Sequence, residues 1–148
     1  MSAAGGAAAD GSAAGDRVIV HVDGGARGNP GPAAIGVVVS DADGTVLDEL
    51  GERIGVASNN VAEYRALLRG LERATALGAR EVELVNDSEL VARQVTGVYK
   101  VKHPAMKPLH EQALAALRGF DRWSIRSVPR ARNARADALV NEALDRHR

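Results

Sequence analysis

The segment HVDGGARGNPGP, residues 21–32, most constrains the fold of this 148-residue chain. An apolar run from Val18 to Val22 ends in a carboxylate, Asp23, and is followed by two glycines and a turn rich in Gly, Asn and Pro. Such a run of β-branched residues predicts a strand inside a sheet, buried on both faces. A buried strand that ends on an acid and opens into a glycine loop can hold a metal ion beside a phosphate.

The composition predicts one domain with a proper hydrophobic core and no cysteine chemistry. Hydrophobic residues make up 45% of the chain, which has no cysteine for a disulfide or a thiolate metal site and so fits a cytoplasmic protein. No apolar stretch reaches the roughly 18 residues of a membrane span, and the N-terminus lacks the features of a signal peptide. We expect residues 1–16, rich in Ala and Gly, to be a disordered tail before a domain at 17–148.

The formal net charge is zero, but its distribution is uneven. Residues 94–110 contain Lys and His and no acid, and the segment from Leu117 to the end has more Arg than acidic residues. These basic segments would suit the phosphates of a nucleic acid. A solvated basic loop at 97–104 is the alternative interpretation.

Periodicity and turn residues predict a single mixed-sheet α/β fold in the order βββαβααβα. The first three strands should form an antiparallel meander, with a hairpin turn at 41–44. The expected strands are 17–24, 33–40, 45–55, 81–86 and 123–128. The expected helices are 59–77, 87–95, 105–119 and 133–145, with loops at 25–32 and 97–104.

Three further carboxylates occupy positions from which they could converge on Asp23. Glu63 lies one turn before Leu67 on the apolar stripe of its helix, where a buried charge requires a cation or the edge of the core. Asp87 follows the fourth strand directly, and Asp137 lies early in the last helix.

Each acid also has a plain structural interpretation. Asp23 could initiate a turn, and Asp87, or Ser88 beside it, could cap a helix. Glu63 and Asp137 could be favoured by helix dipoles. All four together are less easily explained in this way. Their mutual repulsion in one cleft would call for divalent metal, and all-oxygen ligands suit Mg²⁺ or Mn²⁺ rather than zinc.

The four acidic motifs resemble those of the ribonuclease H type 1 family, over nearly everything after residue 16. The family's acids match the strand-end Asp before GNPGP, the Glu after an NN pair, the Asp of a DS pair and the Asp of NARAD. In this chain they are Asp23, Glu63, Asp87 and Asp137. The segments GVYKVKHPAMKPL and VPRARNARAD further resemble actinobacterial-type ribonuclease H domains, some of which are fused to a phosphatase domain that this chain is too short to contain.

The resemblance implies a ribonuclease H-like fold, with three antiparallel strands followed by two parallel ones. It also implies a monomeric endoribonuclease that hydrolyses the RNA strand of RNA/DNA hybrids with two Mg²⁺ or Mn²⁺ ions, leaving 5′-phosphate and 3′-hydroxyl ends. Asp23 would bridge both ions, and Asp137 would complete the site of the attacking water. Glu63 and Asp87 would hold the second ion.

The resemblance also implies a set of substrate contacts. Recognition of 2′-hydroxyl groups would involve the backbone around Gly24 and Gly25, the side chains of Asn29, Asn59 and Asn60, and Glu63 itself. Ser58 would help to bind a phosphate of the DNA strand. The basic loop would contact phosphates through Lys100 and Lys102, with Tyr99 stacking on a sugar or a base. Ser58 or Asn59 could also cap the first helix. Asn133 completes the set of substrate-binding candidates that the resemblance implies.

One position departs from the family pattern. Ser127 stands where many members have a histidine that moves protons and releases product, and none of the four histidines replaces it. Arg130, Arg132 or Arg135 could substitute through electrostatics but not as a proton shuttle. We therefore expect a slower or more metal-sensitive enzyme. The alternatives are another nuclease of the same superfamily, a weakly active hybrid-binding module, or a structural domain of a larger protein.

Overall fold

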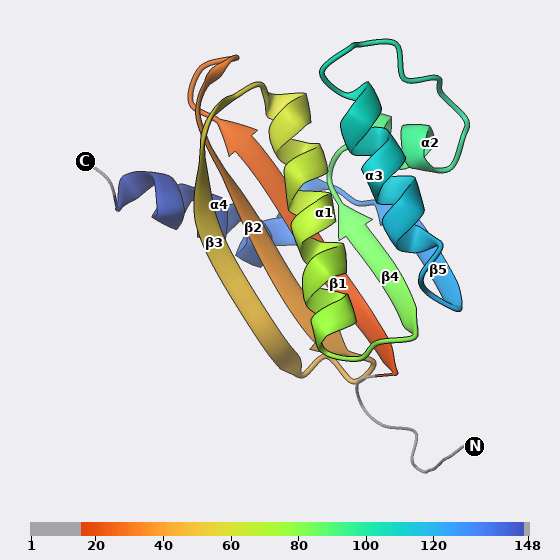
Figure 1. Ribbon diagram of the computed structural model, residues 1–148. Coiled ribbons are helices and arrows are strands. Elements are labelled where there is room, and N and C mark those ends of the chain that lie inside the picture. The colour runs from red at the N-terminus through yellow and green to blue at the C-terminus, as the bar shows by residue number, and fades with distance from the viewer. Residues whose placement is uncertain (1–15, 147–148) are drawn as a thin grey trace.

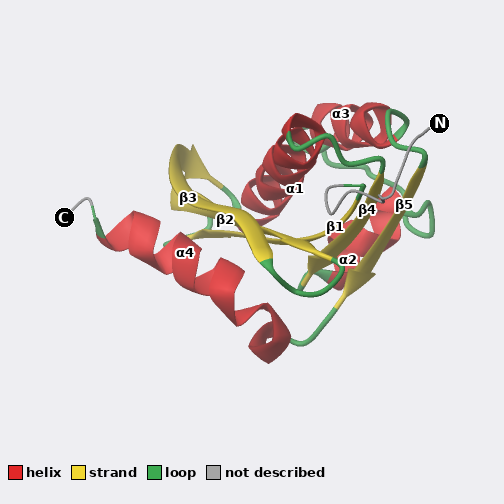
Figure 2. Cartoon of the chain, turned by 90° about the horizontal axis from the view of Figure 1, so that it is seen from below, coloured by secondary structure: helices red, strands yellow, loops and turns green. Residues whose placement is uncertain are grey.

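The computed structural model describes residues 16–146, which form a five-stranded sheet with helices on both faces (Figure 1, Figure 2). The tail expected at 1–16 lies, apart from Asp16, outside the described residues. The strands are β1 (Arg17–Ala26), β2 (Gly31–Asp41), β3 (Val46–Ala57), β4 (Glu81–Asn86) and β5 (Arg122–Ser127). The helices are α1 (Asn59–Ala76), α2 (Glu89–Val95), α3 (Lys107–Leu117) and α4 (Ala134–Asp145), with a 3₁₀ turn at Arg130–Asn133 before α4.

The sheet has the predicted mixed topology, in the order β3-β2-β1-β4-β5. β1 and β2 are antiparallel, as are β2 and β3, whereas β4 pairs parallel to β1 and β5 parallel to β4. His21 of β1 lies opposite Val85 of β4 in this register. Asp23 comes two residues after His21, and Asp87 comes two residues after Val85. The parallel pairing of β1 and β4 therefore brings these two acids to the same end of the sheet.

The sheet separates two layers of packing, with α1 and α3 on one face and α4 on the other (Figure 2). The larger core lies under α1, where Val20, Val37 and Leu84 of three strands meet Leu67 and other apolar residues of the helix. A smaller core lies under α4, whose Val140 packs near Ala34 of β2. Because β2 is covered on both faces, nearly every residue along it is buried.

Two expectations about β1 were wrong. The strand continues to Ala26 and β2 begins at Gly31, so the loop predicted at 25–32 is reduced to 27–30. Pairing between Ala26 and Ala33 extends the hairpin through residues that locally favour a turn. The strand is also not fully buried on both faces, because Ile19 is only half-buried.

α1 begins at Asn59 as predicted, whereas α2, α3 and α4 begin one or two residues later than predicted. α2 begins at Glu89 because the Ser88 hydroxyl caps it, accepting a hydrogen bond from the Val91 N–H at 3.2 Å. Asp87 is therefore not the cap, which removes its plain structural interpretation. α3 begins at Lys107, with a proline in its first turn.

Candidate active site

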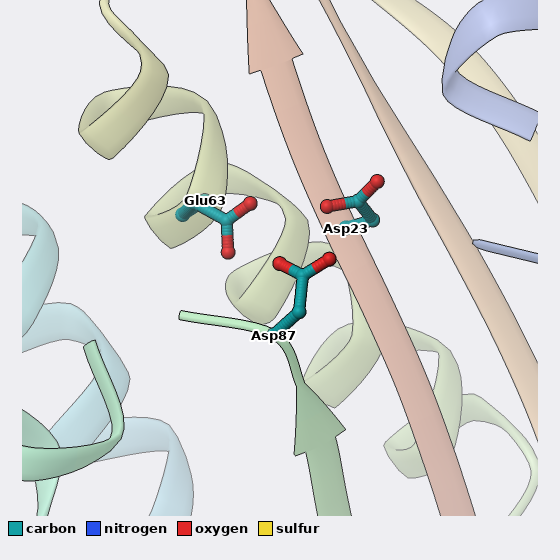
Figure 3. A group of neighbouring side chains, drawn as sticks. All are labelled: Asp23, Glu63 and Asp87. Atoms are coloured by element: carbon teal, nitrogen blue, oxygen red, sulfur yellow. The ribbon is translucent and has the colours of Figure 1, made fainter. Parts of the chain in front are cut away.

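Three of the four predicted acids meet at the carboxyl edge of the sheet (Figure 3). Among residues 16–146, Asp23, Glu63 and Asp87 each offer a carboxylate oxygen, and these oxygens lie within 4.8 Å of one another. They come from β1, from α1 and from the turn after β4. Segments far apart in the chain thus bring three negative charges into one small space.

Glycine at position 24 allows α1 to approach β1 closely enough for Glu63 to reach this space. A Cβ at Gly24 would lie 2.2 Å from the carbonyl oxygen of Ala62, a separation that no side chain could tolerate. The Gly24 N–H donates to Glu63 Oε1 at 3.0 Å, which fixes the carboxylate beside Asp23. The first glycine of the DGG sequence is therefore explained by the packing of α1 on β1.

The carboxylates have unused hydrogen-bonding capacity. Asp23 is 5% and Glu63 is 8% exposed. Within the described part of the chain, Glu63 Oε2 and Asp87 Oδ2 are buried and have no hydrogen-bond partner. A buried carboxylate oxygen without a donor is costly, and a bound cation would satisfy it.

The clustering changes the protonation of the acids. Burial raises the pKa of Asp23 to about 9, and the neighbouring charges of Glu63 and Asp87 contribute to this shift. Burial likewise raises the pKa of Glu63 to about 7, against the opposing effect of the Gly24 N–H. Burial also raises the pKa of Asp87, while the Arg130 guanidinium partly offsets it. A cation bound among these groups would reverse the shifts by favouring the charged forms.

The fourth acid, Asp137, lines the same cavity but is not one of the three clustered carboxylates. It lies in the first turn of α4, whose backbone packs closely on the sheet at Gly36 and Gly51. Asn133, just before this helix, is 1% exposed and donates from Nδ2 to the Val22 carbonyl at 2.8 Å. This hydrogen bond ties the start of α4 to β1 beside Asp23.

The cavity over the carboxylates has a volume of about 480 Å³. Gly24, Gly25 and Asn59, which were predicted to contact substrate, line it. Other lining residues, from β1, from the turns after β1 and β4, and from α4, were not predicted from the sequence. These are Ala26, Arg27, Ser88, Val140, Asn141 and Leu144.

The chain is similar to known ribonucleases H in sequence. Residues 21–143 match a family described as reverse transcriptase-like. The chain is 50% identical over 131 residues to ribonuclease HI of Halobacterium salinarum, covering 88% of this chain and 66% of that protein. It is 52% identical over 130 residues to a bifunctional protein of Mycobacterium tuberculosis, covering 87% of this chain and 36% of that protein.

Solved structures agree with the sequence matches. The crystal structure of the Halobacterium salinarum RNase H1 superposes with a TM-score of 0.86, over 88% of this chain and 98% of that one. The chain belongs to the ribonuclease H type 1 family. LC11-RNase H1, isolated from compost by a metagenomic approach and solved in complex with an RNA/DNA hybrid, is 47% identical. It superposes with a TM-score of 0.84 over 87% of this chain and 97% of that one.

Three residues predicted to contact substrate also accept hydrogen bonds, through their side chains, from backbone N–H groups of the protein itself. The Asn29 side-chain oxygen accepts from the Asn59 N–H at 3.0 Å, and the Asn59 side-chain oxygen accepts from the Ala26 N–H at 2.9 Å. The Ser58 hydroxyl accepts from the Val61 N–H at 3.2 Å and is the α1 cap. Their substrate contacts, and that of the exposed Asn60, remain predictions.

The basic loop does not line the cavity over the acids. Tyr99, Lys100 and Lys102 are exposed, and the Arg93 guanidinium lies 5.5 Å from the centre of the Tyr99 ring. One face of the ring is thus already next to a cation. Any contact of this loop with a hybrid would be at a distance from the clustered carboxylates.

Arg130 is the arginine that the fold places at the acidic cluster. Its Nε lies 3.8 Å from Asp87 Oδ2, and the residue lines the cavity. Arg135 instead pairs with Glu49 and Glu142 on the surface, and Arg132 is not a lining residue.

No helix within residues 16–146 is long and apolar enough to cross a membrane.

Proposed function

We propose that this chain is an endoribonuclease that hydrolyses the RNA strand of RNA/DNA hybrids. The observation that carries the proposal is the convergence of Asp23, Glu63 and Asp87 from three separate elements. The similarity to ribonuclease HI of Halobacterium salinarum, and the structure of LC11-RNase H1 with an RNA/DNA hybrid, support the choice of substrate.

The four acids fit a divalent metal site. Their donors are all carboxylate oxygens, which Mg²⁺ and Mn²⁺ prefer, and two of these oxygens are buried without a partner in the described residues. Asp23 would contact both of two ions, Asp137 would hold the first, and Glu63 and Asp87 the second. The ions would activate the attacking water and stabilise the departing 3′ oxygen, which gives 5′-phosphate and 3′-hydroxyl products.

The residues around the acids would position the RNA strand. The backbone of Gly24 and Gly25 lines the cavity, and because Gly25 has no side chain toward the lining residue Val140, a sugar could approach the backbone closely there. The Asn59 amide group, whose oxygen is already used inside the protein, keeps its N–H donors for a 2′-hydroxyl. We expect the protein to act as a monomer.

Cleavage of an end-labelled RNA/DNA hybrid with Mg²⁺ or Mn²⁺ tests the proposal. Asp87→Asn should abolish cleavage of the RNA strand. Asp121→Asn is a matched control, because Asp121 is an exposed aspartate that pairs with Arg80 away from the acids. It should leave cleavage unchanged.

Other outcomes would lead to different conclusions. Cutting of a DNA duplex would place the chain with another nuclease of the superfamily. Tight hybrid binding without cleavage in either metal would indicate a hybrid-binding module. Binding should weaken steeply with salt because the basic residues neutralise phosphates, and a salt slope near zero would contradict that prediction.

A further inference from the structure

The cavity has a second half that the proposed reaction does not use. Beyond the acids it continues between the turn after β1 and the exposed end of α4. Asn141 and Leu144 of α4 form its wall, and Arg27 of the turn lies at the far end of this wall, next to Asp145. None of the roles described above involves these residues.

One face of α4 connects the two halves. Asp137, Asn141 and Leu144 are separated by four and three residues, so they follow one another along the same side of the helix. The Asn141 Nδ2 group donates to the Asp137 carbonyl oxygen at 3.2 Å. Seven residues of helix span about 10 Å, which corresponds to about three nucleotides of one strand at about 3.4 Å each.

Arg27 is held at the far end of this wall by an ion pair. Its backbone N–H donates to the Pro32 carbonyl at 2.8 Å, which fixes the turn. Its Nη2 lies 2.8 Å from Asp145 Oδ1, and the two side chains are 48% and 55% exposed. An ion pair this exposed stabilises a protein little, so the guanidinium can change partner at small cost.

The charges in the cavity indicate what that partner is. One end is lined by four acids, and among the lining residues Arg27 and Arg130 are the cations. Arg130 lies beside Asp87, whereas Arg27 lies at the end away from the acidic cluster. A planar guanidinium binds a phosphodiester through two parallel hydrogen bonds.

We propose that Arg27 binds a backbone phosphate of the RNA strand, about three nucleotides from the scissile bond. Asp145 orients Arg27 in the free protein and competes with that phosphate. The strand is the RNA strand because this half of the cavity is continuous with the half that contains the acids. The proposal rests on the hybrid-cleaving function proposed above.

Substitutions on the two sides of the ion pair test the proposal, because they should act in opposite directions. Arg27→Ala should raise KM about five-fold with kcat nearly unchanged, and should lower the salt slope of binding by about one. Asp145→Asn should lower KM about two-fold, because it frees the guanidinium for phosphate. Arg27→Lys should recover part of the loss, since it keeps the charge but not the planar fork.

A second exposed ion pair of the same length provides the control. Arg80 Nη2 lies 2.8 Å from Asp121 Oδ2, with 72% and 61% of the side chains exposed. These residues precede β4 and β5, at the opposite edge of the sheet from the acids. Arg80→Ala and Asp121→Asn should leave both KM and the salt slope as in the wild type.

Steady-state cleavage of a labelled hybrid at several salt concentrations separates the possible outcomes. Opposite shifts at positions 27 and 145, with no shift in the controls, would support the phosphate site. A rise in KM for both variants would mean that the ion pair merely ties the turn to α4, and would overturn it. An active Arg27→Ala with wild-type KM and salt slope would also overturn it, while leaving the proposed function intact. A wild-type protein that neither binds nor cleaves the hybrid would overturn both.

Discussion

The backbone of Gly36 in β2 lies against Ala136 in α4, so closely that a Cβ at Gly36 would come 2.2 Å from the Ala136 carbonyl oxygen. Gly51 of β3 makes a similar approach to Leu139, where a Cβ would lie 2.6 Å from the carbonyl oxygen. These two glycines let the helix backbone rest on the sheet. The position of Asp137 relative to Asp23 depends on that spacing.

Gly36→Ala should therefore move α4 outward and carry Asp137 away from the other acids. We expect the free energy of unfolding to fall by about 2 kcal/mol because the added methyl group overpacks the contact. We expect kcat to fall by a larger fraction than the free energy of unfolding, because Asp137 is moved from its position beside the other acids. Urea unfolding and hybrid cleavage would measure both. Gly119→Ala is the control, because its added Cβ would approach one atom at 3.3 Å, outside the sheet. Equal effects of the two substitutions would contradict this role of Gly36.

The metal-free protein should become less stable as pH rises. Asp23 has a pKa of about 9 in the folded protein, and Glu63 one of about 7, because both are buried beside other acids. In the unfolded chain these values fall to about 3.9 and about 4.3. The folded state therefore binds more protons from about pH 4 to about pH 9, so stability decreases across this range.

Asp23→Asn should remove most of this dependence. The variant should be more stable than the wild type by about 2 kcal/mol at pH 8 in EDTA, and should be inactive. Urea unfolding at pH 5.5 and pH 8, with and without Mg²⁺, measures the effect. Added Mg²⁺ should stabilise the wild type at pH 8 and leave Asp23→Asn nearly unchanged. A wild type that becomes more stable with pH in EDTA would contradict the prediction.

Much of the site could be predicted from the sequence because its acids occupy positions defined by local pattern. Asp23 and Asp87 each follow an apolar run of residues, and parallel pairing of β1 and β4 places the ends of these two runs side by side. Glu63 lies on the apolar stripe of α1, which must face the sheet. The order of strands and helices along the chain likewise follows from periodicity and turn residues.

What the sequence did not predict depends on contacts between distant elements. The continuation of β1 to Ala26 follows from pairing with Ala33, which overrides the local preference of glycine for a turn. The cavity reaches Arg27 and Asn141 because close packing at Gly36 determines where α4 lies. No local pattern specifies such a contact. The buried hydrogen bond of Asn133 to Val22 likewise has no signal in the residues around it.

Arg130→Ala should slow cleavage about ten-fold, because a cation close to the reacting phosphate is lost. Arg130 also lowers the pKa of Asp87 against the effect of burial. Its loss should therefore raise that pKa and shift the acidic limb of the kcat/KM profile to higher pH. Arg132→Ala is the matched control, since Arg132 is exposed nearby but does not line the cavity. Identical pH profiles for the two variants would count against Arg130.

Ser127→His should raise the turnover rate several-fold by supplying a proton-transferring group. Ser127 is exposed at the end of β5 and pairs with Asn86, the residue before Asp87, so a histidine there would lie near the acids. Single-turnover and steady-state rates at pH 6 to 9 measure the gain. Ser124→His, on the same strand but further from the acids, is the control. No gain over this control would contradict the interpretation of Ser127 as the missing histidine position.

The Tyr64 hydroxyl donates to Gln94 Oε1 at 2.7 Å, joining α1, next to Glu63, to α2, which follows Asp87. Burial raises the pKa of Tyr64 to about 12, so the hydroxyl remains a donor at neutral pH. Tyr64→Phe should cost about 2 kcal/mol, because it leaves the buried Gln94 oxygen unpaired.

Urea unfolding in EDTA at pH 7 measures this cost, and Tyr99→Phe, which removes an exposed hydroxyl, should have almost no effect. Tyr64→Phe combined with Gln94→Met should recover part of the stability, because both polar partners are then replaced by apolar groups. A double-mutant cycle over the two positions isolates the coupling between them. A coupling energy near zero would mean that the hydrogen bond does not link the two helices, and that Glu63 and Asp87 are positioned by packing alone.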